Sequence, residues 1–155
     1  MITRQTLIAA CVFGSTLIAG AAAAQTLRIG LDADPDTLDP TLLRTFVSHV
    51  VDTALCDGLF GIGLELEIVP QLATEWEWTD DKKGLVIKLR PGVKFHDGEP
   101  FDAAAVKYSI ERHLTMPGST RKSAISPINS VEVIDDHTAK LVLSTPFAPL
   151  LAKLA

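Results

Sequence analysis

Cysteine is scarce in this chain, which has only Cys11 and Cys56 among its 155 residues. Cys11 falls inside an apolar N-terminal segment, so removal of that segment would leave one cysteine and exclude an intramolecular disulfide. Cys56 comes near the end of a predicted helix. We interpret it there as a small buried hydrophobic residue rather than as a reactive thiol.

The sequence also lacks the motifs that enzymes and metal sites need. It contains neither a G-x-S-x-G nucleophile motif nor a glycine-rich phosphate loop. The Asp80-Asp81 and Asp135-Asp136 pairs fall in predicted turns, where solvated carboxylates are the ordinary state. No histidine pair has the spacing of metal ligands, and structural roles are favoured for His49, His96, His113 and His137. We predict no catalytic residue, no metal site, no cofactor and no enzymatic activity.

A basic balance is missing as well. The chain carries 14 Lys and Arg against 19 Asp and Glu, for a net charge of −5. Removing residues 1–24 makes it more acidic, because they contain Arg4 and no acidic residue. Proteins that bind nucleic acids need a basic surface, so nucleic acid is excluded as a partner, whereas small ligands are not.

Residues 1–24 have the composition of a secretory signal peptide. Arg4 precedes an apolar stretch that closes with Ala22-Ala23-Ala24, an A-x-A cleavage site. A membrane anchor is the alternative, but a span needs about 20 strongly apolar residues, and this stretch is rich in Ala and Gly. Lipid attachment at Cys11 would leave almost no hydrophobic region before it. We predict a soluble exported protein, with cleavage near Ala24-Gln25.

Alternation of apolar and polar residues predicts half-buried strands. Trp76 and Trp78 share one face of such a strand, and we interpret both indoles as core residues rather than as groups that stack on a ligand. Polar turns join the strands into hairpins. In chain order, the strands are predicted at residues 27–31, 75–78, 85–90, 130–134 and 139–143.

Two helices complete the predicted α+β fold with its mixed sheets. The second begins at Asp102, whose side chain is placed to cap the free N–H groups, and buries its Val106 side. The first is expected to end at Gly58, which would adopt the left-handed conformation that terminates many helices. Its single apolar stripe at helical spacing consists of Val47, Val50, Val51, Ala54 and Leu55.

Four motifs follow one another in order between Leu72 and Arg112, and together they resemble the signature segment of family 5 of the extracellular solute-binding proteins. They are the Ala73/Trp76 pair, Leu89-Arg90-Pro91-Gly92, Phe95-His96-Asp97-Gly98 and Ser109-Ile110-Glu111-Arg112. The resemblance implies a two-lobed periplasmic binding protein of the type II fold, cluster C.

The resemblance also implies a division of the chain. Residues 25–63 would begin the larger lobe (domain I), and residues 64–155 would form an incomplete smaller lobe (domain Ib). Family members are several times longer, so we expect an N-terminal fragment. Such a fragment is expected to fold poorly alone, because its sheet edges would stay unpaired.

In function, the resemblance implies the substrate-binding component of an ABC importer. Such proteins close two lobes over a peptide, a nickel chelate or a related solute and deliver it to a membrane permease. We expect a monomer with a peptide or similar small solute as ligand and an ABC permease as partner. A non-transport ligand sensor or chaperone-like binder on the same fold, and an exported hydrolase, stay open as alternatives.

Two segments are expected to contact the ligand by this resemblance. Residues after the Thr37-Leu38-Asp39-Pro40 motif point to Arg44, Thr45 and Phe46, and the loop after the signature helix points to Ser119, Thr120 and Arg121. The Arg44 guanidinium could bind a carboxylate or phosphonate through two hydrogen bonds. A plain surface arginine is an equal alternative. Ligand identity stays open among peptides, glutathione, haem, nickel chelates, opines and sugars.

Overall fold

A computed structural model describes residues 27–155 of the chain. The predicted signal peptide and its cleavage site therefore lie outside the described residues. Residues 31–155 form a unit of their own. No helix among the described residues is long and apolar enough to cross a membrane.

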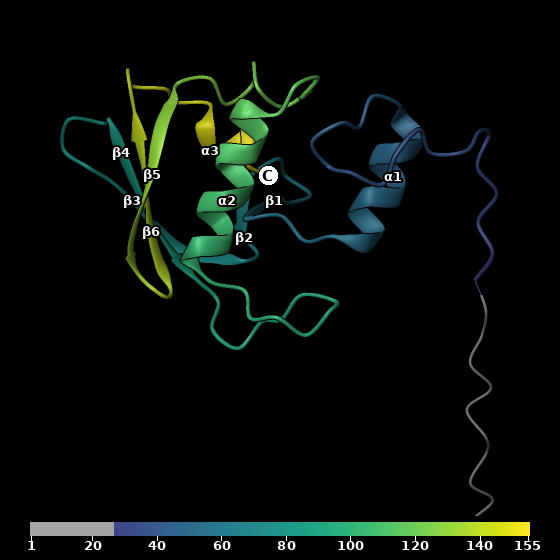
Figure 1. Cartoon of the computed structure of the whole chain (residues 1–155), viewed down its shortest axis with the longest axis horizontal. Helices are drawn as coiled ribbons and strands as arrows, with labels where there is room; N and C mark the ends of the chain where they lie inside the picture. The colour runs from purple at the N-terminus through teal and green to yellow at the C-terminus, as the bar shows by residue number, and fades with distance from the viewer. Residues whose placement is uncertain (1–26) are drawn as a thin grey trace, which may run out of the picture. The chain divides into compact units, whose positions relative to one another are not determined.

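A four-stranded antiparallel sheet is the main element of this unit (Figure 1). The strand order is β3-β4-β6-β5; β3 with β4 and β5 with β6 form hairpins, and β4 pairs with β6 antiparallel. The predicted strands at residues 75–78, 85–90, 130–134 and 139–143 are thereby confirmed with shifted ends. The observed bounds are β3 Ala73–Trp78, β4 Gly84–Leu89, β5 Ile128–Asp135 and β6 Thr138–Leu143.

The predicted strand at residues 27–31 is wrong. These residues are in no strand, and Leu27 and Ile29 are 81% and 71% exposed. A strand needs a neighbour to pair its N–H and C=O groups, and none of the described segments pairs with this one. Alternation alone therefore does not form a strand here.

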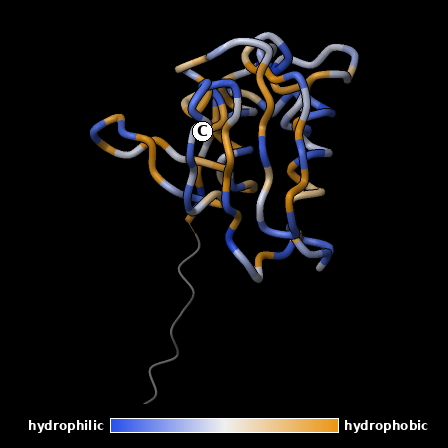
Figure 2. Tube along the Cα trace, turned by 90° about the vertical axis from the view of Figure 1, so that its left-hand side faces the viewer, coloured by the Kyte–Doolittle hydropathy of each residue, from blue (hydrophilic) through white to orange (hydrophobic). Residues whose placement is uncertain are grey.

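Helix α2 (Ala103–Thr115) packs on β5 and β6 and lies along one face of the sheet (Figure 1). Its predicted cap is confirmed, because Asp102 Oδ1 accepts a hydrogen bond from the Ala105 N–H at 2.8 Å. Val106 and Ile110 are buried against the sheet. On the sheet side, hydrophobic and hydrophilic residues alternate along the strands (Figure 2), and the buried positions include Leu85, Ile87, Ala139 and Leu141.

A short antiparallel ribbon adds to this core. It consists of β1 (Phe60–Ile62) and β2 (Ile68–Pro70), and the last helix α3 (Leu150–Lys153) packs against β1. Trp76 and Trp78 are half-buried and pack against the core cluster. Their prediction as core residues is confirmed.

Helix α1 (Phe46–Leu55) departs from prediction at its C-terminal end. The chain leaves the helix at Cys56, which is extended, and Gly58 does not have a positive φ. Only the first part of the apolar stripe is covered: Val47 is buried, whereas Leu55 is 48% exposed. Cys56 is likewise exposed rather than buried as predicted, because it lies beyond the helix. The left-handed ending at Gly58 is also wrong.

Candidate ligand-binding site

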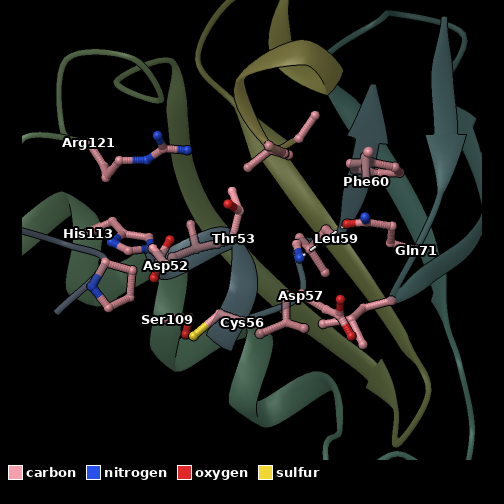
Figure 3. A pocket seen from close by; sticks show the side chains of 18 of the residues that line it. Asp52, Thr53, Cys56, Asp57, Leu59, Phe60, Gln71, Ser109, His113 and Arg121 are labelled. Carbon is pink, nitrogen blue, oxygen red and sulfur yellow. Dashed lines mark hydrogen bonds between the residues drawn. The ribbon is translucent and has the colours of Figure 1, made fainter. Parts of the chain in front are cut away.

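A cleft of about 630 Å³ lies between α1, α2 and the β1 strand (Figure 3). His113 and Arg121 lie on one side of it, and Phe60 and Gln71 on the other. Much of its lining is apolar and comes from the surface of the core. Polar groups from α1 face it as well, including Asp52, which lies on the His113 side.

His113 is held in this wall by a hydrogen bond of 3.0 Å between its Nδ1 and the Thr41 hydroxyl. Burial is the main cause that lowers the pKa of His113 below its ordinary value, and the positive charges of Arg121 and Arg112 add to this effect. His113 therefore favours its neutral form, as a hydrogen-bonding group rather than a charge.

Arg112 connects the end of α2 to the loop before α1. Its Nη1 donates to Asp39 Oδ1 at 2.8 Å, and its Nη2 donates to Asp39 Oδ2 at 2.5 Å. Nη1 also donates to the Thr41 hydroxyl. The paired guanidinium holds the pKa of Asp39 far below its usual range and raises the pKa of Arg112. The pair is bidentate and charge-assisted, the strong form of such a bond.

In the first predicted ligand segment, residues 44–46, one side chain caps a helix and the other two are exposed. The Thr45 hydroxyl caps α1 by accepting from the Ser48 N–H, and it donates to Asp36. Arg44 is exposed and makes no hydrogen bond or ion pair with any residue between 27 and 155. Phe46 is 80% exposed. Arg44 and Phe46 are thus accessible, whereas Thr45 serves the helix.

The second predicted segment is largely engaged in structure. The Ser119 hydroxyl donates to the His113 carbonyl at 2.6 Å, which satisfies an acceptor at the end of α2. The Thr120 N–H and hydroxyl both donate to the Thr41 carbonyl, at 3.0 and 3.2 Å. Arg121 donates to the Lys153 carbonyl and lines the cleft. The other five predicted residues are not part of the cleft lining that the described residues form.

The structure nevertheless brings the two segments side by side. Thr41 and Thr120 are joined by the two hydrogen bonds above, although 79 residues separate them. Arg44 Nη2 lies 3.9 Å from the position that a Cβ atom of Gly118 would take. Gly118 has a φ of +79°, which a glycine adopts without strain. Arg44 and the 117–121 loop thus lie side by side, and we call them the rim; Thr41, which is fully buried, is hydrogen-bonded to this loop.

Sequence reasoning missed Asp39, Thr41, Arg112 and His113 as members of a single cluster. Asp39 and Arg112 both stand inside the recognised motifs, so the signal was a pair of opposite charges at motif positions. Nothing local indicates that they meet, because they are 73 positions apart in the sequence.

The described residues form neither a metal-binding cluster nor a reactive cysteine site. Within residues 27–155, no three His, Cys, Asp or Glu side chains gather closely enough to hold a metal ion. Partial burial and the nearby Asp52 carboxylate raise the pKa of the Cys56 thiol. Its thiolate form is thus disfavoured, which makes it a poor nucleophile although it is exposed.

Solved structures and a family profile both match this chain. Similar solved structures are solute-binding proteins of the periplasmic type, which confirms the predicted fold. The sequence profile of the bacterial extracellular solute-binding proteins, family 5 (its middle region), matches residues 67–155. The chain belongs to this family, as its motifs predicted.

Three similar proteins illustrate the range of the family. The glutathione-binding protein GsiB of Pectobacterium atrosepticum is 32% identical over 155 residues, which cover 99% of this chain and 30% of GsiB. AgaA of A. tumefacien R10, solved with agropinic acid, has a TM-score of 0.74 and 36% identity over 79% of this chain and 25% of AgaA. NikZ of Campylobacter jejuni, solved with Ni(L-His), has a TM-score of 0.71 and 26% identity over 79% and 24%.

The chain spans about 30% of the length of the curated relatives that it matches. The solutes named for these three proteins are glutathione, agropinic acid and Ni(L-His). Their solutes differ while the fold stays the same, so the fold does not select one of them.

Proposed function

We propose that this chain belongs to the substrate-binding component of an ABC importer, which captures a small peptide or a similar solute in the periplasm. The observation that carries this proposal is the rim described above. In a family 5 chain, Thr120 of the second expected ligand segment is hydrogen-bonded to Thr41, three residues before the first segment, and Arg44 lies against Gly118.

The rim suits a solute that carries a carboxylate. The Arg44 guanidinium is exposed and has no partner among residues 27–155, so it is free to form two parallel hydrogen bonds to such a group. Arg121 supplies a second guanidinium on the cleft side of the same rim. Glutathione and agropinic acid, the ligands named for two relatives, are both carboxylic acids. Phe46, two residues after Arg44 in the chain, adds an exposed aromatic ring for the apolar part of the solute.

The rest of the proposal concerns the whole protein. Residues 1–24 act as a cleaved signal peptide, residues 25–63 begin the larger lobe, and residues 64–155 belong to the smaller lobe. The lobes close over the solute, and the closed form, as a monomer, delivers it to the permease. Ligand shifts this equilibrium only as far as it binds the closed form more tightly. The solute is released unchanged, since no catalysis takes place.

Native mass spectrometry of the full-length mature protein, purified gently from the periplasm, tests this function. We expect a bound peptide or another small acid to travel with the protein as a single added mass. Calorimetric titration with reduced glutathione, dipeptides and tripeptides then gives the preferred length. A protein that binds no solute in either measurement would contradict the proposal, and cleavage of a bound peptide during incubation would favour the hydrolase alternative.

A transport experiment separates the importer from a sensor on the same fold. Deletion of the gene should abolish uptake of the labelled solute by cells, and a plasmid copy should restore it. Binding without any loss of uptake in the deletion strain would favour the sensor.

A further inference from the structure

We propose that Arg112 is a positioning residue for the ligand site: it fastens the loop around Asp39 and Thr41 to the end of α2 and so sets the place of Arg44 on the rim. This inference rests on the proposed function. It assigns Arg112 no contact with the solute.

The geometry of the fastening is specific to an arginine. One guanidinium reaches both carboxylate oxygens of Asp39 and, through Nη1, the Thr41 hydroxyl as well. Asp39 Oδ1 also accepts from the Thr41 N–H at 3.0 Å, so the same carboxylate shapes the turn that it anchors. A lysine would bring the charge but not the two parallel donors.

A directed chain of hydrogen bonds continues from this pair. Arg112 can only donate, so the Thr41 hydroxyl oxygen accepts from it. The hydroxyl proton of Thr41 is then free to point at His113 Nδ1. That arrangement requires an unprotonated Nδ1. Two residues at the end of α2 thus hold one threonine of the loop from two sides.

Thr41 passes this constraint to the ligand segments. Its carbonyl accepts both the N–H and the hydroxyl of Thr120, and Arg44 follows three residues later beside Gly118. If the loop moved away from α2, the Thr41 carbonyl would leave Thr120 and the Arg44 side chain would leave the rim. The Arg112–Asp39 pair therefore controls the positions of Thr120 and Arg44, which it does not contact itself.

The other ion pairs among residues 27–155 have no comparable reach. Lys107 and Glu111 are one turn apart on α2, with side chains 42% and 44% exposed. Lys88–Glu75 and Lys140–Glu132 each join neighbouring strands. Arg112–Asp39 is less exposed, at 30% and 26%, and joins parts of the chain that are far apart in sequence. Exposed pairs contribute little, whereas this one joins the loop before α1 to the end of α2.

Hydrogen exchange on the full-length mature protein tests the proposal without any ligand. Arg112→Gln keeps a polar side chain but removes the charge and the pair of parallel donors, and we expect about tenfold faster exchange or more in peptides that cover Thr41 and Thr120. Glu111→Gln, the neighbouring position on α2, breaks a local ion pair and serves as the matched control, with no change expected there. Unchanged exchange in Arg112→Gln would overturn the proposal, as would a uniform increase across α2 and the sheet, which marks a general loss of stability.

A second variant guards against misfolding. Arg112→Lys keeps the positive charge and should fold with the melting temperature of the wild type. It should nevertheless expose the Thr41 and Thr120 peptides to faster exchange, because it lacks the second donor. Full protection of both peptides in Arg112→Lys would mean that charge alone suffices, and the positioning role through a bidentate contact would be wrong.

Binding of reduced glutathione, measured by calorimetry, connects the fastening to the site. We expect Arg112→Gln to raise Kd about tenfold, and to have little further effect in an Arg44→Ala background, because it acts through Arg44. Fully additive effects would overturn that route. If the wild type binds no glutathione while Arg112→Gln still loosens both peptides, glutathione is wrong as the solute and the positioning role is supported.

Discussion

The ring of Phe60 meets the indole of Trp76 edge to face, with centroids 5.1 Å apart and an angle of 83° between the planes. Phe60 is 1% exposed and belongs to the β1 strand, whereas Trp76 belongs to the four-stranded sheet. This contact fastens the short ribbon onto the main core. Edge-to-face pairs add about 0.5–1.5 kcal/mol beyond the burial of their area.

Phe60→Ala should therefore lower the free energy of unfolding by about 3–5 kcal/mol, through a cavity in the core and the loss of the aromatic pair. Urea unfolding followed by tryptophan fluorescence measures this directly. Phe46→Ala is the matched control, since Phe46 is 80% exposed and its loss should change stability by no more than about 0.5 kcal/mol. Equal effects of the two variants would show that Phe60 is not a core residue.

Protonation of His113 should lower the free energy of unfolding in mild acid. Its pKa is lowered in the folded protein, mainly by burial and then by Arg121 and Arg112, against weaker opposite effects of Asp39 and Asp52. The unfolded chain thus takes up the proton first, so the stabilisation is complete above pH 6.5 and is lost as the pH falls through the folded pKa. Asp39 acts in the same direction below pH 3.8.

Urea unfolding of the mature protein between pH 7.5 and pH 5 measures the His113 part. The free energy of unfolding should fall with pH in the wild type, and less steeply in His113→Asn, which keeps an acceptor near the position of Nδ1. His96→Asn changes a histidine that is exposed in a turn and should leave the slope as it is. A slope that His113→Asn does not reduce would assign the acid sensitivity to other groups.

The parts of the fold that sequence predicted correctly are those that local chemistry determines. The Trp76/Trp78 alternation and the turn before Gly84 specify a hairpin without distant help, and the Asp102 cap is a contact over three residues. The strand at residues 27–31 failed because pairing depends on a partner elsewhere. The prediction at Gly58 failed because the helix ends at Leu55, the last residue of its apolar stripe, and the chain is already extended at Cys56.

The candidate site was predicted only in outline, for the same physical reason. The resemblance placed the expected ligand contacts at residues 44–46 and 119–121, but it did not indicate which of these side chains are free. Thr45 and Ser119 carry hydroxyls that helix ends require, and such competition is visible only once the ends are placed. The Asp39–Arg112 pair depends on tertiary structure entirely.

The first turn of α2 offers a stabilising change. Asp102 caps this turn, but the turn contains no acidic residue, so the positive end of the helix dipole is only partly balanced. Ala104→Glu, at an exposed position, should raise the free energy of unfolding by about 0.3–1 kcal/mol. Thermal and urea unfolding both measure it, and high salt should reduce the gain. A gain that salt does not affect would point to helix packing instead of charge.

Removal of the Asp102 cap should destabilise the same helix. Asp102→Ala should cost about 1 kcal/mol, because the Ala105 N–H loses its acceptor, while Asp102→Asn should cost much less. Asp80→Ala is the matched control at an exposed turn, where a change within about 0.5 kcal/mol is expected. If Asp102→Ala behaved like Asp80→Ala, the cap would contribute nothing to α2.

The exposed guanidinium of Arg44 gives the sharpest test of the rim as a ligand site. Arg44→Gln removes a charge that has no partner among residues 27–155, so it should leave the melting temperature unchanged. It should raise Kd for a carboxylate-bearing solute about ten- to a hundredfold, as expected for the loss of a charge-assisted hydrogen bond. Lys122→Gln, an exposed cation next to the second segment, is the matched control. If both variants weaken binding equally, and added salt abolishes the difference from wild type, Arg44 acts only through long-range charge. If Arg44→Gln alone weakens binding, and the methyl ester of the solute binds wild type and variant equally, the carboxylate lies on Arg44.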